Sequence, residues 1–209
     1  MIKNYASFIF LLVSTVVFSQ EVYFASGKNY TKYNYKDANF QSNPNLQSGT
    51  GNFYEVGIVK SLVNKNILYS FGIALNEYNA IGGNSANSYR WDTEYLGLHG
   101  ALLYQFYTHI VGSKNKIDFL AKARLNAATI IYGKQEINGM YYDLINENEF
   151  SGLILESSLG FMAKYQIASF GALSLGYNFG QSVNITNDSR EKISFNTNQL
   201  QLGFHFNIN

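Results

Sequence analysis

The sequence predicts an all-β protein, an eight-stranded antiparallel transmembrane β-barrel. Three observations lead to this fold class: the segments alternate apolar and polar side chains, their connectors alternate in length, and an apolar leader precedes them. In one typical segment Ile67, Tyr69 and Phe71 alternate with Ser70 and Gly72, so one strand face is apolar and the other small and polar. The pattern recurs on nearly every segment, and no helical segment is available to cover the apolar faces. A closed sheet with its apolar face towards lipid satisfies all of these strands.

Residues 1–19 have the composition of a signal peptide. An unbroken run of apolar or small residues extends from Phe8 to Phe18 and follows a positive charge. This run is too short to span a bilayer as a helix, which argues against the alternative of a membrane anchor, but it suits a signal-peptide core. Val17 and Ser19 suit a cleavage site. We therefore expect a signal peptide at 1–19 and an outer-membrane barrel domain at 20–209.

The composition favours the same class and excludes others. Tyr (17) and Phe (16) are abundant, Pro occurs once, and 14% of residues are charged, against roughly 25% in a soluble domain. The absence of Cys excludes disulfides, thiolate metal sites and a lipid-modified cysteine. The net charge is +1 and no basic run stands out, so we expect no nucleic-acid partner.

Eight segments carry the strand pattern, and most reach the roughly 9 to 11 residues that a tilted strand needs to cross a membrane. The first segment has the weakest pattern, because Ser26, Lys28 and Asn29 interrupt it. In order, the predicted strands are 21–33, 52–63, 67–79, 91–107, 116–132, 152–167, 172–183 and 193–208.

The connectors between these strands alternate between long and short, which predicts the orientation of the barrel. The long connectors are 34–51, 80–90, 133–150 and 184–192, and the short ones are 64–66, 112–115 and 168–171. Barrels of this kind have short periplasmic turns and longer external loops, and an even strand number places both termini in the periplasm. The four long connectors then all lie outside the cell, which supports the strand count.

Alternation also predicts which side chains face the lumen. An eight-stranded barrel is just wide enough for side chains to fill its interior, and charges buried there are costly unless they are paired. We therefore expect Glu55 and Glu156 to pair with Lys122 and Arg124 in a plug. A gated ion path through a rearrangeable pair is the functional alternative. Further polar lumen residues are predicted at His99, Gln199, Gln201 and His205.

Aromatic residues near the strand ends predict the two girdles that flank the membrane. Aromatic packing in the core of a soluble sandwich is the alternative reading. The predicted girdle residues are Tyr54, Tyr78, Trp91 and Tyr95 near the outer ends and Tyr104, Phe106, Phe204 and Phe206 near the inner ends.

Residues for catalysis or metal binding are sparse. A lipid-modifying barrel enzyme needs a nucleophile and a base together at the outer rim, and we expect His99 and His205 inside the barrel and His109 in a periplasmic turn. No His, Asp or Glu cluster has metal-ligand spacing, and the acids of the loop 143–149 do not form an EF-hand. The sequence therefore predicts no catalytic residue, no metal and no cofactor.

Three segments carry a resemblance to a known family. Ser48–Ile58 (SGTGNFYEVGI), Leu173–Tyr177 (LSLGY) and Leu200–Phe206 (LQLGFHF) resemble strands of small, porin-like outer-membrane β-barrel proteins of Bacteroidota, which are similar in architecture to the OmpA/OmpX type. The resemblance covers the whole mature chain and implies a cell outer-membrane location, but it names no activity. One departure is the terminal Asn209, because the familiar assembly signal ends in an aromatic residue; Phe206 or Ile208 are candidates for that role.

The sequence thus predicts a non-enzymatic outer-membrane protein that acts through its external loops. The loops 79–89 and 138–148 are rich in Asn, Ser, Tyr and Gly, and suit contact with another surface protein, a glycan or lipopolysaccharide. Outer-membrane lipid is the expected surrounding partner. The alternative function is a narrow pore or transport element.

Overall fold

The computed structural model describes residues 20–39, 41–43, 45–62, 65–83, 88–111, 115–186 and 191–208. The predicted signal peptide and the terminal Asn209 lie outside these residues. In the part of the chain that is described, no helix is long and apolar enough to cross a membrane. The described residues form ten strands: β1 (Gln20–Lys36), β2 (Leu46–Ser61), β3 (Ile67–Glu77), β4 (Ala80–Gly83), β5 (Ser88–Val111), β6 (Asn115–Ile137), β7 (Met140–Asp143), β8 (Leu153–Ala168), β9 (Gly171–Asn184) and β10 (Lys192–Ile208).

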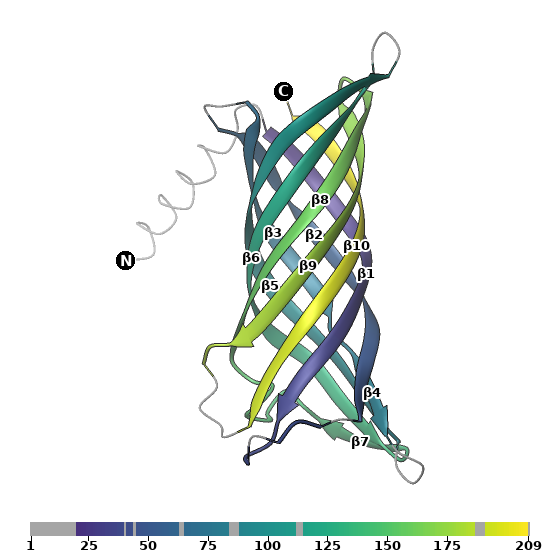
Figure 1. Cartoon of the computed structure of the whole chain (residues 1–209), viewed down its shortest axis with the longest axis vertical. Coiled ribbons are helices and arrows are strands. Elements are labelled where there is room, and N and C mark those ends of the chain that lie inside the picture. The colour runs from purple at the N-terminus through teal and green to yellow at the C-terminus, as the bar shows by residue number, and fades with distance from the viewer. Residues whose placement is uncertain are drawn as a thin grey trace, which may run out of the picture.

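Eight of these strands close into a barrel (Figure 1). Around the ring their order is β1, β2, β3, β5, β6, β8, β9 and β10, and every neighbouring pair is antiparallel. The ring closes where β1 pairs with β10, from Gln20 opposite Ile208 to Lys36 opposite Lys192. The predicted fold class, an all-β, eight-stranded antiparallel barrel, is confirmed.

The two remaining strands, β4 and β7, lengthen the wall at the end that carries the long connectors (Figure 1). β4 pairs with the start of β2 and with β5, and β7 pairs with the end of β6. The turn between β6 and β7 is Asn138–Gly139, and both residues have positive φ, as a two-residue hairpin turn requires. Parts of the connectors that were predicted as loops are therefore strands, because their backbone groups continue to pair beyond the barrel rim.

Side chains alternate between the two faces of the wall, as the sequence pattern predicts. On β9, for example, Leu173, Leu175 and Tyr177 are exposed on the outside, whereas Ser174 and Asn178 are buried inside. Large apolar side chains dominate the outside and polar side chains much of the inside. This arrangement reverses that of a soluble protein and suits a lipid surrounding.

The interior has two parts that differ in chemistry. Charged and amide side chains, with two small apolar clusters among them, occupy the part from the middle towards the short connectors, and aromatic side chains fill the part near the long connectors. Figure 1 places the C-terminal end of β10 with the short connectors. The interior is therefore the candidate site, with its aromatic part near the long connectors and its polar part towards the short connectors.

Candidate functional site

A cluster of charged side chains lies in the middle of the barrel. Glu55 of β2 faces Lys122 and Arg124 of β6 across the lumen, with Glu55 Oε1 3.6 Å from Lys122 Nζ and Glu55 Oε2 3.2 Å from Arg124 Nη2. Glu55 is 1% exposed and Arg124 4%. Because a barrel wall separates these groups from water, they neutralise one another rather than being hydrated.

Arg124 also joins this cluster to the second predicted acid. Its Nη1 lies 3.5 Å from Glu156 Oε2 on β8. Two hydroxyl groups complete the surroundings of this carboxylate: Tyr78 donates to Oε2 (3.0 Å) and Thr197 to Oε1 (2.8 Å). The structure thus brings the four predicted charges together, with Arg124 between two acids and Lys122 beside Glu55.

Tyr23 and His99 extend the cluster on the side of the short connectors. The Tyr23 hydroxyl donates to Glu55 Oε1 (2.6 Å) and lies 2.7 Å from Nε2 of His99. Since the hydroxyl donates its single proton to Glu55, it accepts from His99, which places a proton on Nε2 of the imidazole. The predicted lumen residue His99 therefore acts as a hydrogen-bonded filler.

A second polar group surrounds His205 near the short connectors. His205 Nδ1 lies 2.5 Å from Glu21 Oε1, and its Nε2 lies 2.8 Å from the Ser174 hydroxyl. Lys164 pairs with the other oxygen of Glu21. The connectivity is that of a Ser-His-acid relay, but Ser174 is 3% exposed and borders a cavity of only about 20 Å³, room for about one water molecule. In this conformation an acyl substrate has no access to the serine.

The two predicted glutamines form an amide ladder along the wall. Asn178 donates to Gln199 (3.0 Å) and Gln201 (3.2 Å), and Gln199 donates to Asn29 (3.0 Å). These side chains come from β9, β10 and β1, and all are buried. They fill this part of the lumen with hydrogen-bonded side chains.

An aromatic cluster fills the part of the lumen near the long connectors, and three of its members were predicted in the outer girdle. Tyr78, Trp91 and Tyr95 are buried inside the barrel, and Tyr95 is 0% exposed, so their predicted place in a lipid-facing girdle is wrong. Position near a strand end suggested the girdle, whereas alternation with the outward Leu96 indicated the correct face for Trp91 and Tyr95. Phe195 packs against Tyr78 at 4.3 Å between ring centroids and links the cluster to β10.

The connector after β7 closes this cluster at the end of the barrel that carries the long connectors. It folds inward and buries Leu144 and Phe150, and the Phe150 ring stands perpendicular to Trp91 at 5.1 Å. The backbone N–H of Leu144 donates to the carbonyl of Gly133 (3.1 Å), which anchors the connector to β6. Burial raises the pKa of the neighbouring Glu149 carboxyl above its ordinary value. We call residues 144–151 the lid segment.

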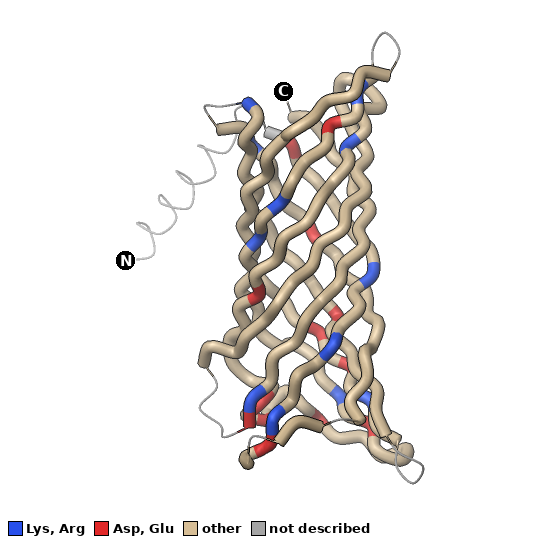
Figure 2. Tube along the Cα trace, in the orientation of Figure 1, with Lys and Arg blue, Asp and Glu red and all other residues tan. Residues whose placement is uncertain are grey.

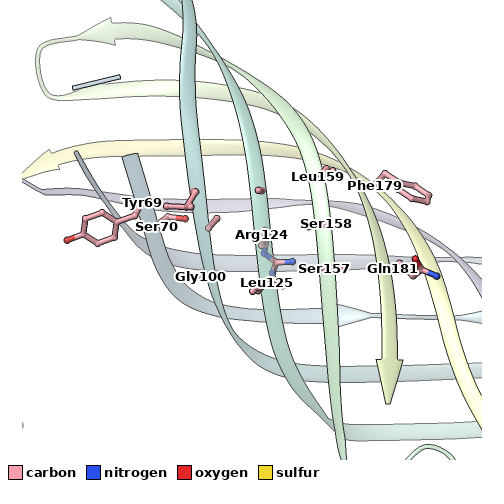
Figure 3. Close-up of a pocket in the computed structure, with 13 residues that line it drawn as sticks. Tyr69, Ser70, Gly100, Arg124, Leu125, Ser157, Ser158, Leu159, Phe179 and Gln181 are labelled. Atoms are coloured by element: carbon pink, nitrogen blue, oxygen red, sulfur yellow. The ribbon is translucent and has the colours of Figure 1, made fainter. Parts of the chain in front are cut away.

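The other predicted girdle residues face outwards. Tyr54, Tyr104, Phe106, Phe204 and Phe206 are each about half exposed, which agrees with their predicted face. Figure 3 shows a hollow on this outer wall, lined by residues of neighbouring strands between Tyr69 at one end and Gln181 at the other. Its volume is about 800 Å³, far larger than the interior cavity.

The acidic loop residues form no metal centre in the structure. Among the residues that the structure describes, no three His, Cys, Asp or Glu side chains lie close enough together to hold a metal ion. Asp143 instead accepts a hydrogen bond from the backbone N–H of Ile145 (2.8 Å) and so shapes the turn.

Comparison with known proteins shows similarity to solved barrels only. No protein-family model matches the chain, and no curated protein is significantly similar to it. Neisserial surface protein A is 14% identical, covers 88% of this chain and 96% of its own, and has a TM-score of 0.46. The attachment invasion locus protein Ail of Yersinia pestis is 13% identical, covers 89% and 98%, and scores 0.38. The outer membrane protease OmpT of Escherichia coli is 8% identical, covers 92% and 97%, and scores 0.36.

These proteins are outer-membrane barrels, and one of them is a protease. At such low identity and TM-score, the similarity carries no conclusion about activity. It does not support the resemblance to Bacteroidota either, because none of these matches points to that group.

Proposed function

We propose that this protein is a non-enzymatic, integral barrel of the cell outer membrane that acts as a structural or binding module through its external loops. The observation that carries the proposal is the contrast between the two faces of the wall. The outside is apolar and exposed, and the inside is packed with paired charges, amides and aromatic rings. Such a molecule can be embedded in lipid and present loops, but it offers no open channel.

The outer surface supports the membrane location. Leu98 is 55% exposed and Leu202 is 62% exposed, and they belong to β5 and β10, on different parts of the ring. Many other large apolar side chains around the ring are exposed in the same way, whereas soluble monomers rarely expose large contiguous apolar patches. Export by the predicted signal peptide and a closed sheet together favour the outer membrane.

The interior supports a plugged lumen. Arg124 and Glu55 meet at the centre, the amide ladder fills the wall beside them, and the lid segment covers the opposite end. Steady conduction would require these pairs to separate, which leaves buried charges without partners. The narrow lumen and the pairing of its buried charges therefore favour a scaffold over a pore.

The long connectors support a role in contact with the outside. Figure 2 shows charged positions gathered at the end that carries them. On β7, Met140, Tyr141 and Tyr142 are exposed, and large side chains of this kind supply contact area in binding surfaces. A surface protein, a glycan or lipopolysaccharide is the proposed partner class.

A planar-bilayer recording on the purified mature chain tests the plug. We expect no sustained conductance from the wild-type protein. The variant Glu55→Gln/Arg124→Gln, which removes the central pair, is the positive comparison, because it should admit water and ions more easily. Sustained conductance of the wild type would overturn the plug and favour the narrow pore.

The narrow pore remains the second candidate because some buried polar atoms lack protein partners. Both polar atoms of the Asn126 side chain and Nδ1 of His99 are among them. Water would satisfy such atoms, and a wet lumen is the starting point for ion passage. A pull-down from native membranes separately tests the binding role, since a scaffold with external loops should retain a partner that a loop deletion of 138–148 releases.

A further inference from the structure

The hollow on the outer wall is continuous and lies where a bilayer would surround the barrel. Two adjoining depressions of about 800 and 750 Å³ share Leu102, Ala123, Leu159 and Phe179 as lining. They exist because Gly100, Ala121 and Ala123 are small, whereas the side chains around them are large. We call these two depressions the outer groove.

The outer groove has a polar margin. Ser157 and Gln181 line the first depression, face outwards and are exposed. They are direct cross-strand partners on β8 and β9. Polar side chains on a lipid-facing wall are unfavourable unless something there satisfies them.

The polar margin continues around the barrel in register. Gln181 lies opposite Asn196, and Asn196 lies opposite Lys32 on β1. The amide oxygen of Asn196 is shielded from solvent and has no hydrogen-bond partner. From Gln181 to Lys32 the margin spans two strand spacings, about 10 Å, and we call Ser157, Gln181, Asn196 and Lys32 the polar strip.

The charge next to the polar strip is positive. Lys28, Lys32 and Lys36 project from the outer face of β1 and are exposed, and Figure 2 shows basic positions spaced along this strand. Two and three strands further round the ring from β1, Glu77 of β3 is the cross-strand partner of Glu94 of β5. An anion is therefore favoured beside β1 and disfavoured beside β3 and β5.

We propose that the outer groove and the polar strip together bind one phosphorylated lipid of the outer leaflet. The hydrocarbon chain lies over the small side chains at Gly100 and Ala123. The polar linkage meets Ser157, Gln181 and Asn196, and the phosphate is held by Lys32. The inference deepens the proposed function, because it rests on a membrane-embedded barrel whose long connectors are external.

Native mass spectrometry of the purified, folded full-length barrel tests this assignment. The probes are dioleoyl phosphatidic acid, diacylglycerol with the same chains, and inorganic phosphate. We expect one copy of phosphatidic acid to bind at least fivefold more tightly than diacylglycerol. Lys32→Gln should weaken phosphatidic acid binding about fivefold, as expected for one lysine at an anionic lipid surface, and leave diacylglycerol binding unchanged.

Two variants complete the design. Ala123→Phe fills the groove and should weaken the binding of both lipids. Lys60→Gln is the matched control, because Lys60 also projects from the wall but lies near the short connectors on β2. Heat-modifiable gel mobility verifies that each variant is folded.

Several outcomes would overturn the proposal. Equal binding of the two lipids, or equal effects of Lys32→Gln and Lys60→Gln on phosphatidic acid binding, would show that Lys32 does not hold the phosphate. Displacement of phosphatidic acid by inorganic phosphate would show a free-anion site without the groove. A dimer that Ala123→Phe dissociates would show that a second copy covers the groove. Surface labelling of the loops is independent of these results, so a failure here is distinguishable from a failure of the proposed function.

Discussion

The charge cluster gives the sharpest prediction, because Arg124 is shared between two acids. Replacing Arg124 by Met leaves Glu156 with only hydroxyl partners, while Glu55 keeps Lys122 at 3.6 Å. Breaking a buried pair by removing one partner costs about 3 to 5 kcal/mol. We expect Arg124→Met near the upper end of this range. We expect Glu156→Gln near the lower end, because the amide oxygen still accepts from one of the two hydroxyl groups and the amide NH2 donates to the other, which turns to accept.

The double variant distinguishes a network from independent sites. If Arg124 and Glu156 interact, the loss of unfolding free energy in the double variant should be smaller than the sum of the single losses, by about 0.5 to 3 kcal/mol. The pair Lys122 and Glu156 should show a clearly smaller coupling, because Lys122 contacts Glu55 instead. Unfolding in denaturant can be followed by gel mobility and by the fluorescence of Trp91, the single tryptophan. Strict additivity for Arg124 and Glu156 would refute the shared ion pair.

Three further predictions test the outer face, the orientation and the lid segment. Leu98→Arg and Leu155→Arg each place a charge on the lipid-facing wall and should each lower the free energy of unfolding by about 2 to 4 kcal/mol. Ser158 faces the lumen, so the loss of stability in Ser158→Arg should come from steric crowding instead. Equal losses at all three positions would contradict the assigned faces. A tag inserted at Gly83 or Gly139 should be reached by antibody on intact cells and one at Asn115 should not, so labelling at Asn115 would reverse the orientation. Phe150→Ala removes the ring that packs against Trp91, so it should lower the free energy of unfolding by about 3 kcal/mol and shift the tryptophan emission to the red. Tyr141→Ala on the exposed β7 should change neither the stability nor the emission.

The strand number and the faces of the wall were predictable because they depend on local alternation. Around Leu98 on β5 and Leu155 on β8, apolar side chains recur at every second position. This period of two determines which side of the strand faces outwards. The meeting of Glu55 with Lys122 and Arg124 was also predictable in kind, since a narrow barrel must pair its buried charges. The hairpin turn at Asn138–Gly139 was missed, although this dipeptide is a strong turn signal.

The aromatic cluster and the lid segment were not predictable from position along the strands. Tyr78, Trp91 and Tyr95 lie near strand ends, where an interfacial girdle is common, yet they pack in the lumen because their side chains are on the inner face of the wall, which still needs filling there. Leu144 and Phe150 look like ordinary loop residues in the sequence. Their burial follows only when the connector folds back over the barrel mouth.

The sequence by itself determined a closed barrel, its lipid-facing side and the identity of the charges inside it, because alternation and composition act over a few residues. The tertiary structure decided which acid meets which base, since Arg124, Glu55 and Glu156 come from three strands whose register sets the distances. It also decided where the outer wall is hollow. Small residues at Gly100 and Ala123 form a groove only when the register of β5 and β6 brings them near each other beside the large side chains of β8 and β9.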